Sequence, residues 1–177
     1  ISAGYGINKK DNWVYLMQQK FDEEGNSIKL INSSVSGDTT GGGLGRLAKN
    51  LKKFKPDFVL IELGGNDALR GYSIKLIKSN LEKMIALIKQ NESKVLLMQI
   101  RIPPNYGQKY MLAFEKIYKD LALSEEVYLM PFMLEEIGIN SELMQPDGIH
   151  PNKKAQSLIA KDVKKNIDKF LLINQSN

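Results

Sequence analysis

The fold class is decided by a nearly continuous apolar run, Phe58-Val59-Leu60-Ile61-Glu62-Leu63, which leads directly into Gly64-Gly65-Asn66-Asp67. Such a run is typical of a strand that is central in a parallel sheet and buried on both faces. Other short apolar runs lie at about 28–34, 94–100 and 127–130. Segments of helical period alternate with them, at about 11–24, 43–54, 73–90, 108–123 and 152–172. The alternation predicts an α/β fold with helices on both faces of a parallel sheet.

Length and composition limit the architecture. The 177 residues fit one domain, so residues 1–177 are expected to form a single unit. Hydrophobic residues make up 42% of the chain, and no run of about 18 apolar residues could cross a membrane, which indicates a soluble protein. The absence of cysteine excludes disulfides and thiol catalysis. The chain opens at Ile1 without a methionine or a signal peptide, so we interpret its start as processed or cut.

The net charge of +5 comes from lysines that are spread along the chain. The densest groups are Lys52-Lys53 with Lys55, and Lys164-Lys165, where exposed helix faces are expected. No basic stripe with interleaved aromatic residues accompanies them, so a solvated surface is favoured over a nucleic-acid site. Contact with a lipid surface or with anionic substrates stays open.

Ligand sites in open parallel sheets form where loops leave the carboxyl ends of the strands. Four loops qualify because polar or glycine residues follow an apolar run directly. They are residues 36–39, 64–67, 101–107 and 131–150.

His150 is the only histidine, so any histidine-based mechanism must use it. Asp147 lies three residues earlier in a turn, and an aspartate that accepts a hydrogen bond from one ring nitrogen leaves the other free to take a proton from a hydroxyl nucleophile. The alternative is that Asp147 only turns or caps the chain before the last helix. A metal site is less favoured, because one histidine without clustered carboxylates falls short of the usual ligand sets.

Two further loops offer hydrogen-bond donors. Asn66 follows two glycines, and its side-chain N–H could stabilise a developing oxyanion; the backbone N–H of Gly37 could do the same. The alternative at Asn66 is a tight turn, and at Gly37 it is a turn or a helix cap by Asp38, Thr39 or Thr40. The glycine run at 41–43 is no phosphate loop, because no Lys-Ser/Thr pair follows it.

Taken in order and spacing, the blocks Ser36-Gly37-Asp38-Thr39, Gly64-Gly65-Asn66-Asp67 and Asp147-Gly148-Ile149-His150-Pro151 resemble those of the SGNH hydrolases, also called GDSL esterases and lipases. The similarity is closest to the bacterial branch of multifunctional acyl-CoA thioesterase I, protease I or lysophospholipase L1. It extends from Ser2 to about Ile159.

The resemblance implies a flavodoxin-like three-layer α/β/α fold and a serine hydrolase without metal or organic cofactor. It assigns His150 as the base, Asp147 as its orienting partner, and Gly37 and Asn66 as oxyanion donors. It also places two groups of residues against the substrate: a loop that shifts on binding, with Ala68, Leu69 and Arg70, and an acyl groove lined by Ile102, Pro103 and Tyr106.

The implied substrates are acyl esters and thioesters such as lysophospholipids, acyl-CoA and aryl or short-chain esters. Carbohydrate O-deacetylases share the same blocks and are the nearest alternative. The resemblance also implies a monomer in the bacterial periplasm or outside the cell, with the cytoplasm as an alternative.

The family's first block, Gly-Asp-Ser after the first strand, does not occur in these residues, and Ile1 matches the residue after the nucleophile. We therefore expect the nucleophilic serine, and the strand before it, immediately upstream of Ile1. Ser2 falls two positions beyond the nucleophile's place and is expected to form local hydrogen bonds instead. The alternative is a binding module that has lost its nucleophile.

Overall fold

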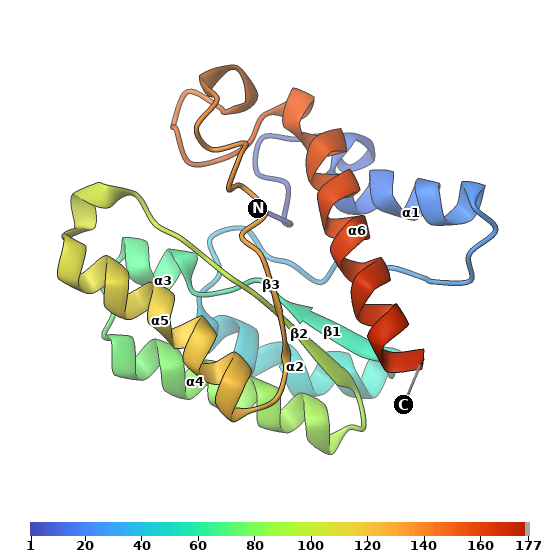
Figure 1. Cartoon of the computed structure of the whole chain (residues 1–177), viewed down its shortest axis with the longest axis horizontal. Coiled ribbons are helices and arrows are strands. Elements are labelled where there is room, and N and C mark those ends of the chain that lie inside the picture. The colour runs from blue at the N-terminus through green and yellow to red at the C-terminus, as the bar shows by residue number, and fades with distance from the viewer. Residues whose placement is uncertain (176–177) are drawn as a thin grey trace. The chain divides into compact units, whose positions relative to one another are not determined.

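The computed structural model describes residues 1–175 (Figure 1). It contains two compact units, one of Ile1–Ser36 with Met133–Asn177 and the other of Gly37–Phe132. Across residues 1–175 no helix combines the length and the apolar character that crossing a membrane requires.

The unit of residues 37–132 is built on a parallel sheet of strand order β1-β2-β3. Its strands are β1 (Phe58–Ile61), β2 (Lys94–Met98) and β3 (Tyr128–Met130). Val59 pairs with Val95, and Leu97 pairs with Leu129. Parallel neighbours need a crossover connection, and helices supply it here. The sheet therefore ends its three strands at one edge, and the loops that leave this edge carry most of the predicted site residues.

Four helices belong to this unit: α2 (Thr40–Phe54), the short α3 (Gly65–Leu69), α4 (Ile74–Gln90) and α5 (Gln108–Ser124). The α4 helix contacts β2 and buries Ile77, Leu81 and Ile88 completely. Thr39 and Ser73 cap the N-termini of α2 and α4, because each side chain accepts a hydrogen bond from a backbone N–H inside the first turn. The caps determine where these helices begin relative to the loops before them.

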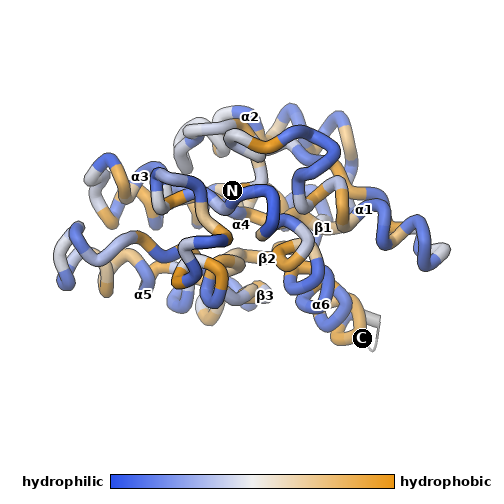
Figure 2. Tube along the Cα trace, turned by 90° about the horizontal axis from the view of Figure 1, so that it is seen from above, coloured by the Kyte–Doolittle hydropathy of each residue, from blue (hydrophilic) through white to orange (hydrophobic). Residues whose placement is uncertain are grey.

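The other unit packs α1 (Trp13–Glu23) against α6 (Gln156–Gln175). Trp13, Met17 and Phe21 lie at helical spacing and are buried on one face of α1. Hydrophilic and hydrophobic residues alternate along both helices (Figure 2). The backbone N–H of Trp13 donates to Oε1 of Gln156 over 3.1 Å, which ties the two helix starts together.

Short 3-10 turns complete the structure: η1 (Lys9–Asp11), η2 (Pro104–Tyr106), η3 (Ser141–Leu143) and η4 (Lys153–Ala155).

The structure confirms the α/β class and the parallel sheet. It also confirms the five predicted helices and the strands near 57–63, 94–100 and 127–130. The helix predicted at 43–54 begins three residues earlier, because Thr39 supplies its cap.

The strand predicted at 28–34 is wrong: within the described residues this segment belongs to no strand or helix. Its backbone bonds to side chains instead. Gln18 donates from Nε2 to the carbonyl of Ile28 over 3.1 Å and accepts at Oε1 from the N–H of Leu30 over 2.7 Å. The amide of Gln18 thus satisfies two backbone groups of this segment, and an apolar run alone does not reveal which partner is present.

The predicted central position of the run at 58–63 is also wrong for the described residues. The β1 strand lies at the edge of the sheet, and Phe58, Val59 and Leu60 are only half-buried. The central strand is β2, where Val95 to Met98 are all buried. An apolar run indicates that a strand is buried, but it does not indicate the position of that strand in the sheet. That position depends on which other segments pair with the strand.

Candidate active site

Asp147 and His150 form one closed turn. The carboxylate accepts hydrogen bonds at Oδ1 from the backbone N–H groups of Ile149 and His150, both over 2.9 Å. Its Oδ2 lies 2.8 Å from Nδ1 of His150. Gly148, at φ +66°, provides the left-handed residue that lets the chain reverse between them. The predicted contact between the two side chains is therefore present.

The surroundings of Asp147 favour its ionised form. Partial burial opposes ionisation, but the N–H groups of His150 and Ile149 and the His150 ring outweigh it and lower the pKa of Asp147 to about 2. An ionised carboxylate accepts hydrogen bonds only, so Nδ1 of His150 carries a proton and donates a hydrogen bond to Asp147. The remaining nitrogen, Nε2, is then free to accept a proton. The His150 side chain is 32% exposed, so solvent or a ligand can reach it.

Gln145 fastens the His150 turn to the first residues of the chain. Its backbone N–H donates to the carbonyl of His150 over 2.7 Å, and its Nε2 donates to the carbonyls of Tyr5 over 2.8 Å and Pro151 over 3.1 Å. The ring of Tyr5 lies against the ring of His150, with centroids 4.7 Å apart. Sequence reasoning did not find Gln145 or Tyr5. The only signal for Tyr5 is a glycine on each side of it.

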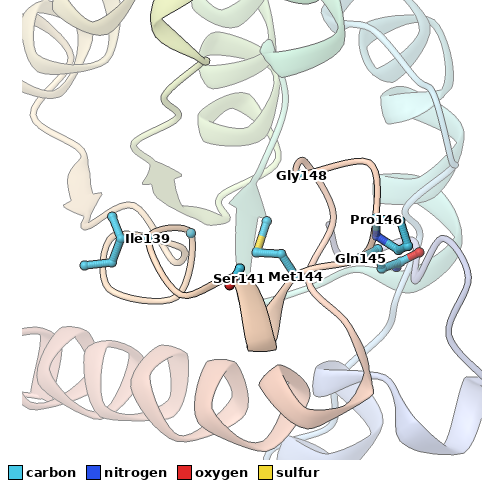
Figure 3. A pocket seen from close by; sticks show the side chains of 7 residues that line it. Ile139, Ser141, Met144, Gln145, Pro146 and Gly148 are labelled. Carbon is cyan, nitrogen blue, oxygen red and sulfur yellow. The ribbon is translucent and has the colours of Figure 1, made fainter.

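An open hollow of about 490 Å³ lies in the same segment of the chain (Figure 3). Its lining combines apolar and polar residues, which are Gly138, Ile139, Ser141, Met144, Gln145, Pro146 and Gly148. Gln145 thus contributes to the hollow as well as to the His150 turn.

Gly37 and Asn66 lie in the unit that contains the sheet. Gly37 is exposed in a turn at φ +74°, and Asn66 lies in the first turn of α3, directly after β1 and its glycine pair. Within residues 1–175, neither the N–H of Gly37 nor the side-chain amide of Asn66 donates a hydrogen bond to the protein. Both donors are therefore available to a ligand, which is what an oxyanion site requires.

Two connections join the Gly37 turn to the Asn66 helix. Arg70 donates from Nη2 to the carbonyl of Gly37 over 3.0 Å. Asp67, which is 1% exposed, accepts from the N–H of Thr40 over 2.8 Å and from its hydroxyl over 2.5 Å, and Asn80 donates to the same hydroxyl over 3.0 Å. This buried network fixes the start of α2 to α3, so the two predicted oxyanion segments are held to each other.

The predicted substrate-binding residues differ in exposure. Ala68 is fully buried and Ile102 is 7% exposed, whereas Leu69, Pro103 and Tyr106 are half-buried and Arg70 is exposed. Their contact with an acyl chain stays a prediction. Ser2 is buried, and its backbone carbonyl accepts hydrogen bonds from the side chains of Asn12, the cap of α1, and Asn32, which lie 10 and 30 positions along the chain.

Comparisons with known proteins decide the family. The sequence pattern described as the GDSL-like Lipase/Acylhydrolase family matches residues 1–158. The chain belongs to this family. As a member of the GDSL family it is a hydrolase, and the predicted resemblance is confirmed.

Individual GDSL relatives agree with this assignment. An "Arylesterase" of Vibrio mimicus is 48% identical over 171 residues, which are 97% of this chain and 86% of that protein. The "Thioesterase 1/protease 1/lysophospholipase L1" of Escherichia coli strain K12 is 42% identical over 90% of this chain and 76% of its own length. Among solved structures, the psychrotrophic esterase EstA from Pseudoalteromonas sp. has a TM-score of 0.94 at 42% identity, over 96% of this chain and 93% of that one.

Proposed function

We propose that this GDSL-family hydrolase is a serine esterase and thioesterase that cleaves acyl esters and thioesters through an acyl-enzyme. The observation that carries the proposal is the turn in which the carboxylate of Asp147 accepts a hydrogen bond from Nδ1 of His150, which leaves Nε2 free. That arrangement orients a general base for a hydroxyl nucleophile.

In this proposal the nucleophile is the serine of the family's first block, whose place falls immediately before Ile1. Nε2 of His150 takes the serine proton as the serine oxygen bonds to the carbonyl carbon, and Asp147 stabilises the imidazolium that forms. The N–H of Gly37 and the amide of Asn66 receive the oxyanion. His150 then gives the proton to the leaving alcohol or thiol, and water repeats the sequence to release the acid. We also propose that the chain forms a single hydrolase domain.

The names of the relatives support the substrate class. They denote an arylesterase, an esterase TesA and a thioesterase/lysophospholipase, at 48%, 43% and 42% identity. We therefore expect aryl esters, acyl-CoA and lysophospholipids as substrates.

The alternative is a carbohydrate deacetylase, which a faster turnover of acetylated sugars than of these esters would support. We also propose that the protein is a monomer and is exported to the periplasm. Size-exclusion chromatography tests the first proposal, and cell fractionation tests the second.

A fluorophosphonate probe tests the nucleophile directly. One relative's structure is described as EstA "inhibited by monoethylphosphonate", so a phosphonate is a suitable probe class. We expect the full-length protein to take up one label per chain, as measured by intact mass. The His150→Ala variant should label slower by about two orders of magnitude or more, because the serine then lacks its base. An unlabelled full-length protein would show that the chain is a binding module.

A further inference from the structure

Tyr5 covers one face of the His150 imidazole. The two ring centroids are 4.7 Å apart and the ring planes are inclined by 39°. Tyr5 is nevertheless 56% exposed, so a large part of its ring remains open to solvent beside the histidine. Both residues belong to the same unit of the structure. An exposed aromatic ring next to a proton-transferring group is a surface on which a ligand can stack.

The turn that presents Tyr5 depends on the glycines on both sides of it. Gly4 and Gly6 have φ values of +73° and +69°, in the left-handed region. A Cβ atom on Gly4 would lie 2.7 Å from Nδ2 of Asn12, and one on Gly6 would lie 2.7 Å from Oε1 of Gln145. A larger residue at either place would strain the backbone and displace a hydrogen-bonded amide.

Gln145 then holds this turn beside the histidine. One side-chain nitrogen donates to the carbonyl of Tyr5 over 2.8 Å, while the backbone N–H of the same residue donates to the carbonyl of His150 over 2.7 Å. The distance between the Tyr5 and His150 rings is thus set by one residue that bonds to both backbones. The tyrosine ring is placed by the fold and is not a loose surface side chain.

The chemistry at His150 determines what lies next to Tyr5 during the reaction. Nδ1 is bound to Asp147, so the proton must pass to the leaving group from Nε2. Such a transfer requires the leaving atom within about 2.6–3.2 Å of Nε2. A leaving group at that distance projects past the edge of the imidazole, and the ring that flanks the imidazole on one face is Tyr5.

We propose that Tyr5 is a specificity-determining residue that recognises the leaving group and favours aromatic, planar leaving groups over small alkyl ones. The inference rests on the proposed function, because His150 meets a leaving group only in acyl transfer. In the step concerned, the serine oxygen–carbonyl bond forms, the carbonyl–aryloxy bond breaks, and the aryloxide takes the proton from Nε2. The open face of Tyr5 stacks on the aryl ring during this step and has no such contact with an ethyl group.

The test compares two esters with the same acyl group, phenyl butyrate and ethyl butyrate, in the full-length protein. The quantity to measure is kcat/KM, which reports the steps up to the departure of the leaving group. For Tyr5→Leu we expect kcat/KM to fall about 3- to 10-fold for the phenyl ester and by less than about twofold for the ethyl ester. Tyr5→Phe keeps the ring and should retain both values. Tyr15→Leu, at an exposed tyrosine of α1, is the matched control and should change neither.

Each outcome is decisive. An equal loss on both esters would mean that Tyr5 only positions His150, and no loss on either would mean that it has no role; both overturn the proposal. The unchanged ethyl ester rate shows that the Leu variant is folded. A wild-type protein that hydrolyses neither ester overturns the proposed function together with this inference, whereas an active wild type without a selective loss overturns the inference alone.

Discussion

Asp147 makes its contacts within a four-residue turn, and its chemistry can therefore be altered without disturbing the rest of the chain. In Asp147→Asn, the side-chain oxygen can still accept the N–H groups of Ile149 and His150, so the turn is retained. The amide no longer stabilises the imidazolium or fixes the Nδ1 proton. We expect kcat to fall by roughly 10²- to 10⁴-fold. Asp120→Asn, at an exposed carboxylate paired with Lys116, is the control and should keep its rate. A near-normal rate in Asp147→Asn would refute the assigned role.

The same carboxylate links stability to pH. Its pKa is about 2 in the folded protein, below the ordinary value of 3.8, because the folded state supplies three hydrogen bonds to the ionised form. The folded state therefore holds the proton less tightly than the unfolded state. The stabilisation is fully present above about pH 4 and is lost as the pH falls towards about 2. The side chain is 37% exposed, so solvent screening keeps the effect small.

Urea unfolding of the wild type and of Asp147→Asn measures this linkage. The difference between their free energies of unfolding should be constant from neutral pH down to about pH 5, and should shrink between about pH 4 and pH 2. A difference that grows on acidification would contradict the assigned direction of the pKa shift.

Contacts at residue level were predictable only where they are local. The Asp147–His150 pair spans three positions in a turn, so residue type and spacing are enough to predict it. Tyr5 and His150 are far apart in the sequence, and their contact depends on Gln145, a residue with no pattern that marks it. The buried Thr40–Asp67–Asn80 network was also missed, because its members are far apart in the sequence. They belong to three different helices, α2, α3 and α4.

Among the elements, the passage from β1 into α3 is the most constrained backbone near the predicted oxyanion site. Gly64 has φ +112°, and a Cβ there would lie 2.1 Å from the hydroxyl of Tyr118, which donates to the carbonyl of Leu63. Gly64→Ala therefore combines backbone strain with the loss of a buried hydrogen bond. We expect a loss of roughly 3 kcal/mol in the free energy of unfolding.

The control for this prediction is Gly71→Ala. Gly71 also has a positive φ, +69°, but no atom lies within 4 Å of the place of its Cβ. Only the backbone strain applies, so about 1 kcal/mol should be lost. Equal losses in the two variants, measured by urea unfolding, would show that the Tyr118 contact contributes nothing.

The elements themselves were largely predictable, because helical period and caps are local properties of the chain. The five predicted helices lie where their apolar period places them, the short α3 was not predicted, and three of the four predicted strands follow their apolar runs. The fourth prediction, at 28–34, was wrong because a strand requires a second segment to pair with. The carbonyl of Ile28 and the N–H of Leu30 bond to the side chain of Gln18, a partner that no periodicity indicates.

At the scale of the whole molecule, the charge is spread and not concentrated. Lys52, Lys53 and Lys55 are exposed, as predicted for a solvated face, but Lys164 is an exception. Its side chain is 15% exposed and bridges Glu24 and Asp168. The hydrogen bond to Glu24 and the contacts with Asp168 outweigh the opposing effect of burial and raise the pKa of Lys164 above its usual value. This lysine therefore stabilises the fold and is not available to a ligand.

Over the whole chain, 25 basic residues against 20 acidic ones give the protein a net charge of +5 and an isoelectric point near 9.2. A net positive field attracts anionic substrates over distances that salt can screen. We therefore expect kcat/KM for an anionic lysophospholipid, lysophosphatidylglycerol, to fall about 2- to 10-fold when NaCl is raised from about 0.02 M to about 0.5 M. Lysophosphatidylcholine, which is zwitterionic, is the control and should change little. A salt response of equal size for both lipids would show that the charge of the whole molecule does not guide the substrate, and would leave recognition to the contacts of the site alone.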